Sequence, residues 1–238
     1  MSPFQLQDPL PLEAGLLVSS EIILKLITPL LTTARQEKID RVARHRNFSN
    51  ALVLEGIYDR GNVSAVMRTA EALGFVNFHI IETQTRFKEA NRVTQGADKW
   101  TEVEKWSTTR DCITTLKKRG HRIIVTSLEA SKPIHEVDFS TPTALVLGNE
   151  KEGISQEMKE IADERIILPM QGFVQSYNIS VAGALSLYHI YQQRMQKLGR
   201  VEDVTHEQIQ ILKAHYALRT QDSSLDILKR HFNNQSLS

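Results

Sequence analysis

The sequence predicts an α/β fold in which a parallel sheet is flanked by helices. Short apolar runs typical of buried strands alternate along the chain with segments of helical periodicity, and this alternation is characteristic of parallel sheets. Turns rich in glycine, asparagine and aspartate follow several of these runs. The composition, 41% hydrophobic and 24% charged over 238 residues, is that of a globular protein and excludes a disordered chain or a collagen-like repeat.

The first 50 residues predict a helical extension. Their most apolar stretch, residues 16–31, is interrupted by Glu21, Lys25 and Pro29, and no basic region precedes it. We therefore expect an amphipathic helix that packs on the body of the protein, and neither a secretory signal nor a membrane span.

The core elements are expected from residue 51 onward. An apolar run over 52–58 ends in the turn 59–62, and apolar residues then recur at helical spacing until Gly74 stops them. The further predicted elements are a strand over 76–81, a long polar loop over 83–99, a helix over 108–119, strands over 122–128 and 143–147, a short helix over 155–162, a strand over 165–168, a long helix over 178–198 and one or two helices over 203–233. The predicted organisation is a helical N-terminal extension (1–50), a central α/β domain (51–198) and a helical C-terminal extension (199–238).

Charge and cysteine content restrict the partners and the location. Lys and Arg number 29 against 28 Asp and Glu, a formal net charge of +1, which excludes a histone-like polycation but allows basic residues to cluster on one face. Basic runs at 35–46, 86–99 and 117–122 are candidate phosphate contacts, with ordinary solvated surface as the alternative. The single Cys112 forms no intrachain disulfide, so a reducing compartment is expected. Because neither a secretory signal nor a membrane span is expected, a cytoplasmic location follows by elimination. The C-terminal histidines lack cysteine partners, and no metal site is expected.

Glycine-bearing loops follow three of the predicted strands. Ligands of open parallel sheets bind beyond the carboxyl ends of the strands, so these loops are the candidate site. The first loop, 59–62, leads into a helix that carries Arg68. The structural alternative for Asn62 is that it is the N-cap of this helix. Arg68 likewise reads as a solvated helix residue, although its apolar neighbours predict crowded surroundings.

The other two loops also have structural explanations, as an ordinary turn and as helix caps. Residues 148–153 carry two glycines spaced as in a P-loop, but Ile154 follows where a phosphate-binding lysine is required, and GxGxxG is absent. This excludes a nucleoside triphosphate or dinucleotide site and leaves a tight turn that exposes backbone amides and Glu150. The third loop, 168–180, enters a helix through side chains that could each be a cap.

Taken together and in order, the three loops resemble the motifs of the SpoU (TrmH-like) family of RNA ribose 2'-O-methyltransferases, within the SPOUT superfamily. The motifs cover residues 62–70 with Gly74, 145–155 and 168–182, and the resemblance extends over about residues 50–195. The sequence departs from the family pattern at Tyr177, where leucine is usual, at Gly183, where alanine is usual, and in a longer N-terminal extension.

The resemblance implies a fold, a cofactor and a set of site residues. It implies a C-terminal deep trefoil knot from about Gly120 to the helix that begins at Asn178, and a homodimer with the site near the subunit interface. It implies that S-adenosylmethionine lies bent in the knot loops and leaves as S-adenosylhomocysteine. The implied cofactor contacts are Thr126, Gly148, Leu168, Met170, Ser176, Tyr177 and Asn178. The implied catalytic residues are Asn62, Arg68, Glu150, Ser176 and Asn178.

The resemblance further implies S-adenosylmethionine-dependent methylation of a guanosine 2'-hydroxyl in the D-loop of tRNA, with neither DNA nor membrane as a partner. Because guanidinium stays protonated in proteins, we expect Arg68 to hold a phosphate and stabilise charge on the attacking oxygen rather than act as a base. The alternatives are the same reaction on ribosomal RNA, a catalytically silent RNA-binding dimer, and a small-molecule α/β enzyme.

Overall fold

The computed structural model describes residues 3–12, 15–57, 59–82, 98–129, 132–149, 151–221 and 223–235. The chain forms two compact units. The first contains residues 47–202, and the second contains residues 4–46 together with 203–238. The segments predicted as separate N- and C-terminal extensions therefore contribute to one common unit.

A seven-stranded sheet forms the centre of the first unit, with the strand order β5-β4-β3-β8-β6-β9-β7. The strands are β3 (Asn50–Glu55), β4 (Asn77–Ile81), β5 (Glu102–Trp106), β6 (Arg122–Thr126), β7 (Lys132–Pro133), β8 (Thr143–Leu147) and β9 (Glu164–Ile167). Among the described residues, all pairs of neighbouring strands in this sheet are parallel. The predicted parallel α/β sheet is confirmed.

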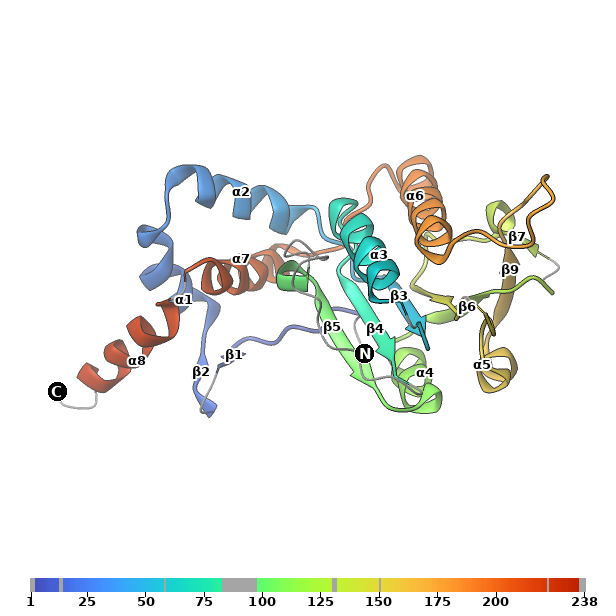
Figure 1. The fold of residues 1–238 in the computed structure, drawn as a ribbon. Helices are drawn as coiled ribbons and strands as arrows, with labels where there is room; N and C mark the ends of the chain where they lie inside the picture. The colour runs from blue at the N-terminus through green and yellow to red at the C-terminus, as the bar shows by residue number, and fades with distance from the viewer. Residues whose placement is uncertain are drawn as a thin grey trace. The chain divides into compact units, whose positions relative to one another are not determined.

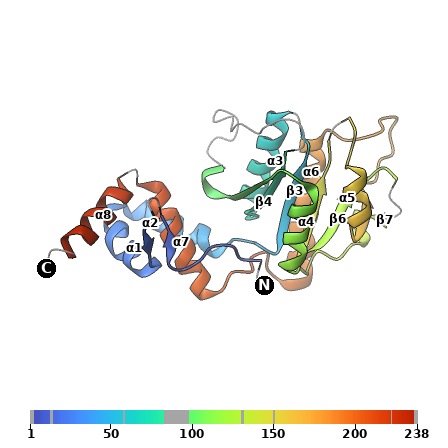
Figure 2. The same cartoon turned by 90° about the horizontal axis from the view of Figure 1, so that it is seen from below.

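Helices cover both faces of this sheet (Figure 1). On one face lie α3 (Arg60–Ala72) and α6 (Ile179–Leu198), and on the other lie α4 (Thr109–Lys118) and α5 (Gln156–Ile161). Figure 2 views the sheet from the side of α4 and α5. Because side chains alternate along a strand, Leu52 and Leu54 of β3 enter the core below α3 and α6, whereas Val53 enters the core below α4 and α5.

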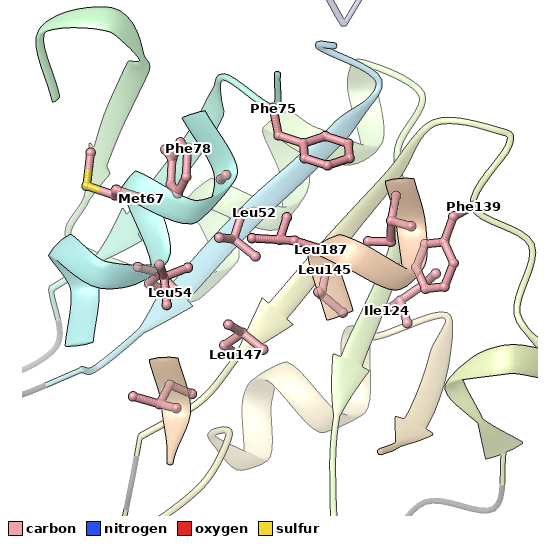
Figure 3. Close-up of a cluster of buried hydrophobic side chains, with 14 of the residues drawn as sticks. Leu52, Leu54, Met67, Phe75, Phe78, Ile124, Phe139, Leu145, Leu147 and Leu187 are labelled. Carbon is pink, nitrogen blue, oxygen red and sulfur yellow. The ribbon is translucent and has the colours of Figure 1, made fainter. Parts of the chain in front are cut away.

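The larger core lies between the sheet and the α3–α6 layer (Figure 3). Leu145 and Leu147 of β8 are fully buried there against apolar residues of both helices. This packing leaves little room for a side chain at Gly183 of α6. A Cβ atom at Gly183 would lie 2.9 Å from Val66 Cγ2 and 3.2 Å from Leu147 Cδ1. The glycine thus allows α6 to approach both α3 and β8 closely.

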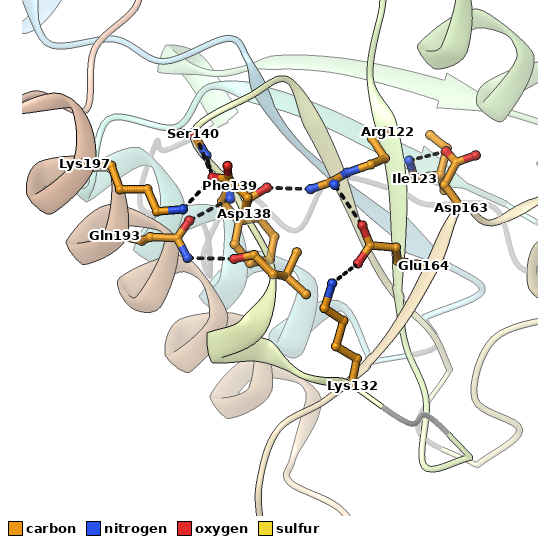
Figure 4. Close-up of polar contacts among 11 residues, drawn as sticks. Arg122, Ile123, Lys132, Asp138, Phe139, Ser140, Asp163, Glu164, Gln193 and Lys197 are labelled. Carbon is orange, nitrogen blue, oxygen red and sulfur yellow. Dashed lines mark hydrogen bonds and ion pairs between the residues drawn. The ribbon is translucent and has the colours of Figure 1, made fainter.

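Polar contacts fix the C-terminal half of α6 to the segment 137–140, which precedes β8 (Figure 4). The Gln193 side chain accepts a hydrogen bond from the backbone N–H of Phe139 and donates one to the carbonyl of Val137, both at 2.7 Å. Lys197 forms an ion pair with Asp138 at 3.1 Å. These contacts satisfy backbone groups that are buried outside regular secondary structure.

The second unit is mainly helical. Its elements are β1 (Leu10–Pro11), β2 (Leu17–Val18), α1 (Ser20–Ile27), α2 (Thr33–Arg44), α7 (His206–Thr220) and α8 (Ser224–Gln235). The described residues also form short 3₁₀ helices: η2 (Thr28–Leu30) in this unit, and η3 (Asp98–Trp100) and η4 (Ile134–Glu136) in the first. Helix α7 packs on α1 and α2, and Lys213 of α7 forms an ion pair with Asp40 of α2 at 2.9 Å.

The sequence predictions missed several of the short or edge strands. Strand β5 was missed, because its five residues include Glu102, Glu104 and Lys105 and form no apolar run. It is an edge strand, and charged residues are usual at sheet edges. The hairpin β1–β2 was missed because each strand has only two residues. Within the described ranges, no helix combines the length and the hydropathy that a membrane span requires.

Candidate functional site

The first unit has a topological switch point between β3 and β8, which pair with each other. The chain leaves β3 through α3 on one face of the sheet and leaves β8 through α5 on the other. In open α/β sheets, ligands bind beyond the carboxyl ends of the strands at such a point. The predicted loops after β3, β8 and β9 all begin at this edge of the sheet.

The loop after β8 is a closed turn tied to the loop after β3. The Asn149 side-chain amide donates to the carbonyl of Gly56 at 2.7 Å, and its oxygen accepts from the backbone N–H of Lys151 at 2.8 Å. Asn149 and Gly153 also exchange two backbone hydrogen bonds. A Cβ atom at Gly148 would lie 2.4 Å from the Gly153 carbonyl carbon, so glycine is required there. Asn149 was not among the predicted site residues, although asparagine before a tight turn is a recognisable signal.

The loop after β9 is joined to α3 through two asparagines. Asn178 is the N-cap of α6, since its side-chain oxygen accepts from the backbone N–H of Ser180 at 2.9 Å. Its amide nitrogen donates to the side-chain oxygen of Asn62 at 3.3 Å. The alternative reading of Asn62 as a helix N-cap is wrong: the N-cap of α3 is Asp59, whose side chain accepts from the Gly61 N–H at 2.7 Å. Asn62 lies in the first turn of α3.

The rest of the third loop offers its backbone to solvent. Residues 171–176 are exposed, and the loop from 168 to 178 carries no charged side chain. Tyr177 closes its base by donating from its hydroxyl to the Pro169 carbonyl at 3.1 Å. In the part of the chain that the structure describes, the backbone N–H groups of residues 170–177 donate no hydrogen bond to protein.

The remaining predicted contacts have varied surroundings. Leu168 and Met170 are half-buried, and Leu168 packs against the larger core. Thr126, at the end of β6, is half-buried and donates from its hydroxyl to the Val146 carbonyl at 3.1 Å. Ser176 is exposed. Glu150 lies outside the described residues.

Arg68 is exposed on α3, so the prediction that its neighbours crowd it is wrong. Successive helix residues are rotated by about 100°, so Val66 and Met67 enter the core while Arg68 projects away from it. Arg68 follows Asn62 by six positions, which is about 9 Å along the helix axis. The structure thus joins Asn62 to Asn178 and shows no direct contact between Arg68 and either asparagine.

The basic runs differ in how far they are neutralised. In the run 117–122, Lys117 pairs with Asp163 at 2.8 Å, Arg119 with Glu104 and Arg122 with Glu164. Residues 86–97 lie outside the described part of the chain.

On α2, the Arg44 side chain hydrogen-bonds Asp40 at 2.7 Å and, with Lys213, lowers the pKa of that carboxyl to about 2. Arg35, Lys38 and Arg41 of α2 are exposed and form no ion pair with the described residues.

Two other features do not mark a site. Within the described ranges, no three or more of the His, Cys, Asp and Glu side chains are grouped so that they could hold a metal ion. A cavity of about 400 Å³ lies in the second unit and is lined by residues of α1, α2 and α7. The carboxyl edge of the sheet is distinguished by its topology and its loop contacts.

The fold and this edge define an α/β protein whose loops at a topological switch point form the candidate ligand site. The sequence profile of the SpoU rRNA Methylase family matches residues 49–188, and the chain belongs to this family.

Known relatives agree with this assignment. A protein of Thermus thermophilus named tRNA (guanosine(18)-2'-O)-methyltransferase is 34% identical over 166 residues, which are 69% of this chain and 86% of the relative. The crystal structure of the Aquifex aeolicus TrmH/SpoU tRNA modifying enzyme superposes with a TM-score of 0.70 at 33% identity, covering 77% of this chain and 95% of that one. The SpoU methyltransferase AviRb of Streptomyces viridochromogenes, crystallised with the cofactor AdoMet, shares the fold with a TM-score of 0.57 at 21% identity, over 61% of this chain and 57% of that one.

Proposed function

We propose that this chain is an S-adenosylmethionine-dependent methyltransferase that modifies the 2'-hydroxyl of a guanosine in the D-loop of tRNA. The observation that carries the proposal is the meeting of three motifs, far apart in the sequence, at one edge of the sheet. The Asn62–Asn178 hydrogen bond joins the first and third motifs, and the Asn149–Gly56 hydrogen bond ties the second motif to the loop after β3, which leads into the first. The tRNA substrate is supported by relatives such as that of Thermus thermophilus.

The cofactor is assigned to the loops after β6, β8 and β9. The residues that would hold it are Thr126, Gly148, Leu168, Met170, Ser176, Tyr177 and Asn178. The third loop fits S-adenosylmethionine because its exposed backbone N–H groups have no protein partner among the described residues and can bind an uncharged purine edge. When bound, the cofactor supplies an electrophilic methyl group on a sulfonium.

The catalytic roles are assigned to Arg68, Asn62, Glu150, Ser176 and Asn178. The exposed guanidinium of Arg68 would hold a phosphate beside the target ribose and stabilise negative charge on the attacking oxygen. The linked asparagines would orient the ribose. Oriented placement alone can lower a barrier by about 7–11 kcal/mol.

The RNA is expected to contact the exposed cations of α2. Arg35, Lys38 and Arg41 lie on that helix without ion-pair partners in the described ranges, whereas most cations of the 117–122 run are neutralised. An electrostatic grip of this kind predicts that log K falls by about 0.7–0.9 per neutralised phosphate for each tenfold rise in salt.

A homodimer is the proposed assembly, and an apolar stripe on α6 supports it. Val181, Leu185, Tyr188, Met195 and Leu198 are each at least 41% exposed and recur at helical spacing along one side of α6. Contiguous apolar surface of this kind marks an interaction site.

The proposal includes the domain organisation, the chain topology and the cellular location of the enzyme. We assign the methyltransferase domain to residues 51–198, with helical extensions at 1–50 and 199–238, and place a deep trefoil knot in its C-terminal part. The likeness to the Aquifex enzyme supports this topology. The proposed location is the cytoplasm.

Labelled methyl transfer to fractionated RNA tests the proposed function. The purified protein is incubated with labelled S-adenosylmethionine and with tRNA or ribosomal RNA from cells that lack the enzyme, and alkali-resistant linkages are mapped. We expect label at one D-loop guanosine of tRNA. Label in ribosomal RNA would favour that alternative substrate, whereas binding of RNA without transfer would indicate a silent RNA-binding dimer.

A further inference from the structure

Glu55, the last residue of β3, is a buried carboxylate that the reaction as described above does not use. It is only 3% exposed. Its Oε1 accepts from the hydroxyls of Thr109 at 2.7 Å and Ser155 at 2.8 Å, and its Oε2 accepts from the backbone N–H of Ser155 at 2.9 Å. It has no ion pair in the part of the chain that the structure describes. Burying a carboxylate is costly, and these three donors are what compensates it.

The two donor residues belong to different parts of the unit. Thr109 is the first residue of α4, which packs on the face of the sheet away from α3. Ser155 is the last residue of the loop after β8 and the N-cap of α5, where its hydroxyl also accepts from the backbone N–H of Met158 at 3.1 Å. Glu55 therefore binds one residue of the α4 layer and one residue of the site.

Both ends of the loop after β8 are held by two consecutive residues. Glu55 binds Ser155 at the far end, and the Gly56 carbonyl accepts from Asn149 at the near end. Because Glu55 accepts both the N–H and the O–H of Ser155, it fixes the orientation of that residue as well as its distance. An uncharged acceptor would satisfy the N–H and the hydroxyl of Ser155 without the cost of burying a charge. Support for the start of α5 therefore does not by itself explain why a carboxylate lies here.

We propose that Glu55 is a positioning residue that, through Ser155, holds the described residues of the loop after β8 in the conformation that receives the methyl donor. This inference rests on the proposed function, because it takes the Gly148 loop as part of the S-adenosylmethionine site. Glu55 acts through Ser155 and touches neither the cofactor nor the RNA.

Four variants separate this role from a purely structural one. Glu55→Ala removes the anchor, and Ser155→Ala removes the hydroxyl on the loop side. Thr109→Val, the matched control, removes the hydroxyl bonded to the same carboxylate oxygen on the α4 side. Glu55→Gln keeps one oxygen that can accept from the Ser155 N–H and tests for partial rescue. Each variant is examined by thermal unfolding, by amide hydrogen exchange without cofactor, and by calorimetric titration with S-adenosylmethionine.

We expect faster exchange at the amides of Gly153 and Ser155 in Glu55→Ala and Ser155→Ala, with at least about tenfold weaker binding of S-adenosylmethionine, the change expected for loss of one hydrogen bond to a charged group. Thr109→Val should lower the unfolding temperature and leave both the loop exchange and the affinity unchanged, and Glu55→Gln should recover part of the affinity. If Glu55→Ala does not fold, the comparison of Ser155→Ala with Thr109→Val still tests whether the contact between Glu55 and Ser155 positions the loop.

Equal effects of Ser155→Ala and Thr109→Val on affinity, or unchanged loop exchange in a folded Glu55→Ala protein, would overturn the inference. If the wild-type protein itself does not bind S-adenosylmethionine, the proposed function fails instead, and the exchange of the loop still shows whether Glu55 holds it.

Discussion

The side-chain amide of Asn178 donates a hydrogen bond to the side-chain oxygen of Asn62 at 3.3 Å. Asn178 caps α6 and Asn62 lies in the first turn of α3, so this one bond joins the first and third motifs. Asn178 has two separable tasks, since its oxygen caps the helix while its nitrogen reaches across to Asn62.

Asn178→Ser should separate these tasks. Serine is about as good an N-cap as asparagine but is too short to reach Asn62, so we expect near wild-type stability with methyl transfer reduced about tenfold or more. Asn178→Ala loses both contacts and should also cost about 0.5–2 kcal/mol of stability. Thermal unfolding and single-turnover methyl transfer measure the two effects. Full activity of the folded Asn178→Ser protein would show that the contact between the asparagines is not needed for the reaction.

Arg68→Ala should abolish turnover without destabilising the protein. The side chain is exposed and has no partner among the described residues, so the free energy of unfolding should change by no more than about 0.5 kcal/mol. We expect methyl transfer to fall at least about 100-fold with unchanged affinity for S-adenosylmethionine. Arg68→Lys should recover little activity, because an ammonium lacks the planar fork that grips phosphate. Lys25→Ala, at an exposed cation of α1 outside the basic runs, is the control. Weakened cofactor binding with a normal single-turnover rate would contradict the assigned role.

Gly183→Ala should destabilise the first unit through contact with Val66. The added Cβ would lie 2.9 Å from Val66 Cγ2, and overpacking of this kind costs about 1–3 kcal/mol, against about 1 kcal/mol gained in helix propensity. In a Val66→Ala background the clash with Val66 is removed and only the 3.2 Å contact with Leu147 remains, so the same substitution should then cost less free energy of unfolding. Urea unfolding of the four proteins gives the coupling energy. Additive effects would show that Val66 does not restrict residue 183.

The stability of the first unit should fall in acid because of His79. Burial, followed by the nearby charges of Arg119 and His121, lowers the pKa of His79 from 6.5 to about 3. The unfolded chain therefore binds one more proton than the folded one between about pH 6.5 and 3. The contribution of neutral His79 to the free energy of unfolding is fully present above pH 6.5. It decreases by up to about 1.4 kcal/mol per pH unit as the pH falls from 6.5 toward 3. Urea unfolding followed by tryptophan fluorescence at pH 7.5 and 5.5 should show a smaller loss in His79→Gln. The same loss in both proteins would mean that other groups cause the acid sensitivity.

A charge on the apolar stripe of α6 should prevent dimer formation. Leu185 is 45% exposed, and a carboxylate there would be buried unpaired in an interface. We expect wild-type protein to sediment as a dimer and Leu185→Glu as a monomer near 27.1 kDa. Thr114→Glu, on an exposed position of α4, is the matched control. A dimeric Leu185→Glu protein would place the interface elsewhere.

The sequence predicted elements and motifs that depend on local patterns. The strand at 143–147 agrees with β8, and the helix at 178–198 agrees with α6 and its cap, because apolar runs and capping residues are local signals. Strand β5 was missed because its signal is the pairing with β4, not its own composition.

Contacts between distant residues could not be predicted in the same way. Glu55 and Ser155 are 100 residues apart, and no periodicity indicates that they meet. The surroundings of Arg68 were misjudged because its sequence neighbours point in other directions around α3. The three loops were identified by their motifs, whereas the side-chain contacts that join them required the structure.

Methyl transfer to a pair of matched tRNA transcripts tests the central claim most directly. One transcript is unmodified, and the other carries 2'-deoxyguanosine at the D-loop position that the mapping identifies. The account predicts that labelled S-adenosylmethionine transfers its methyl group to that single guanosine of the first transcript and to no nucleotide of the second. Equal labelling of both transcripts, or label on a base, would contradict it.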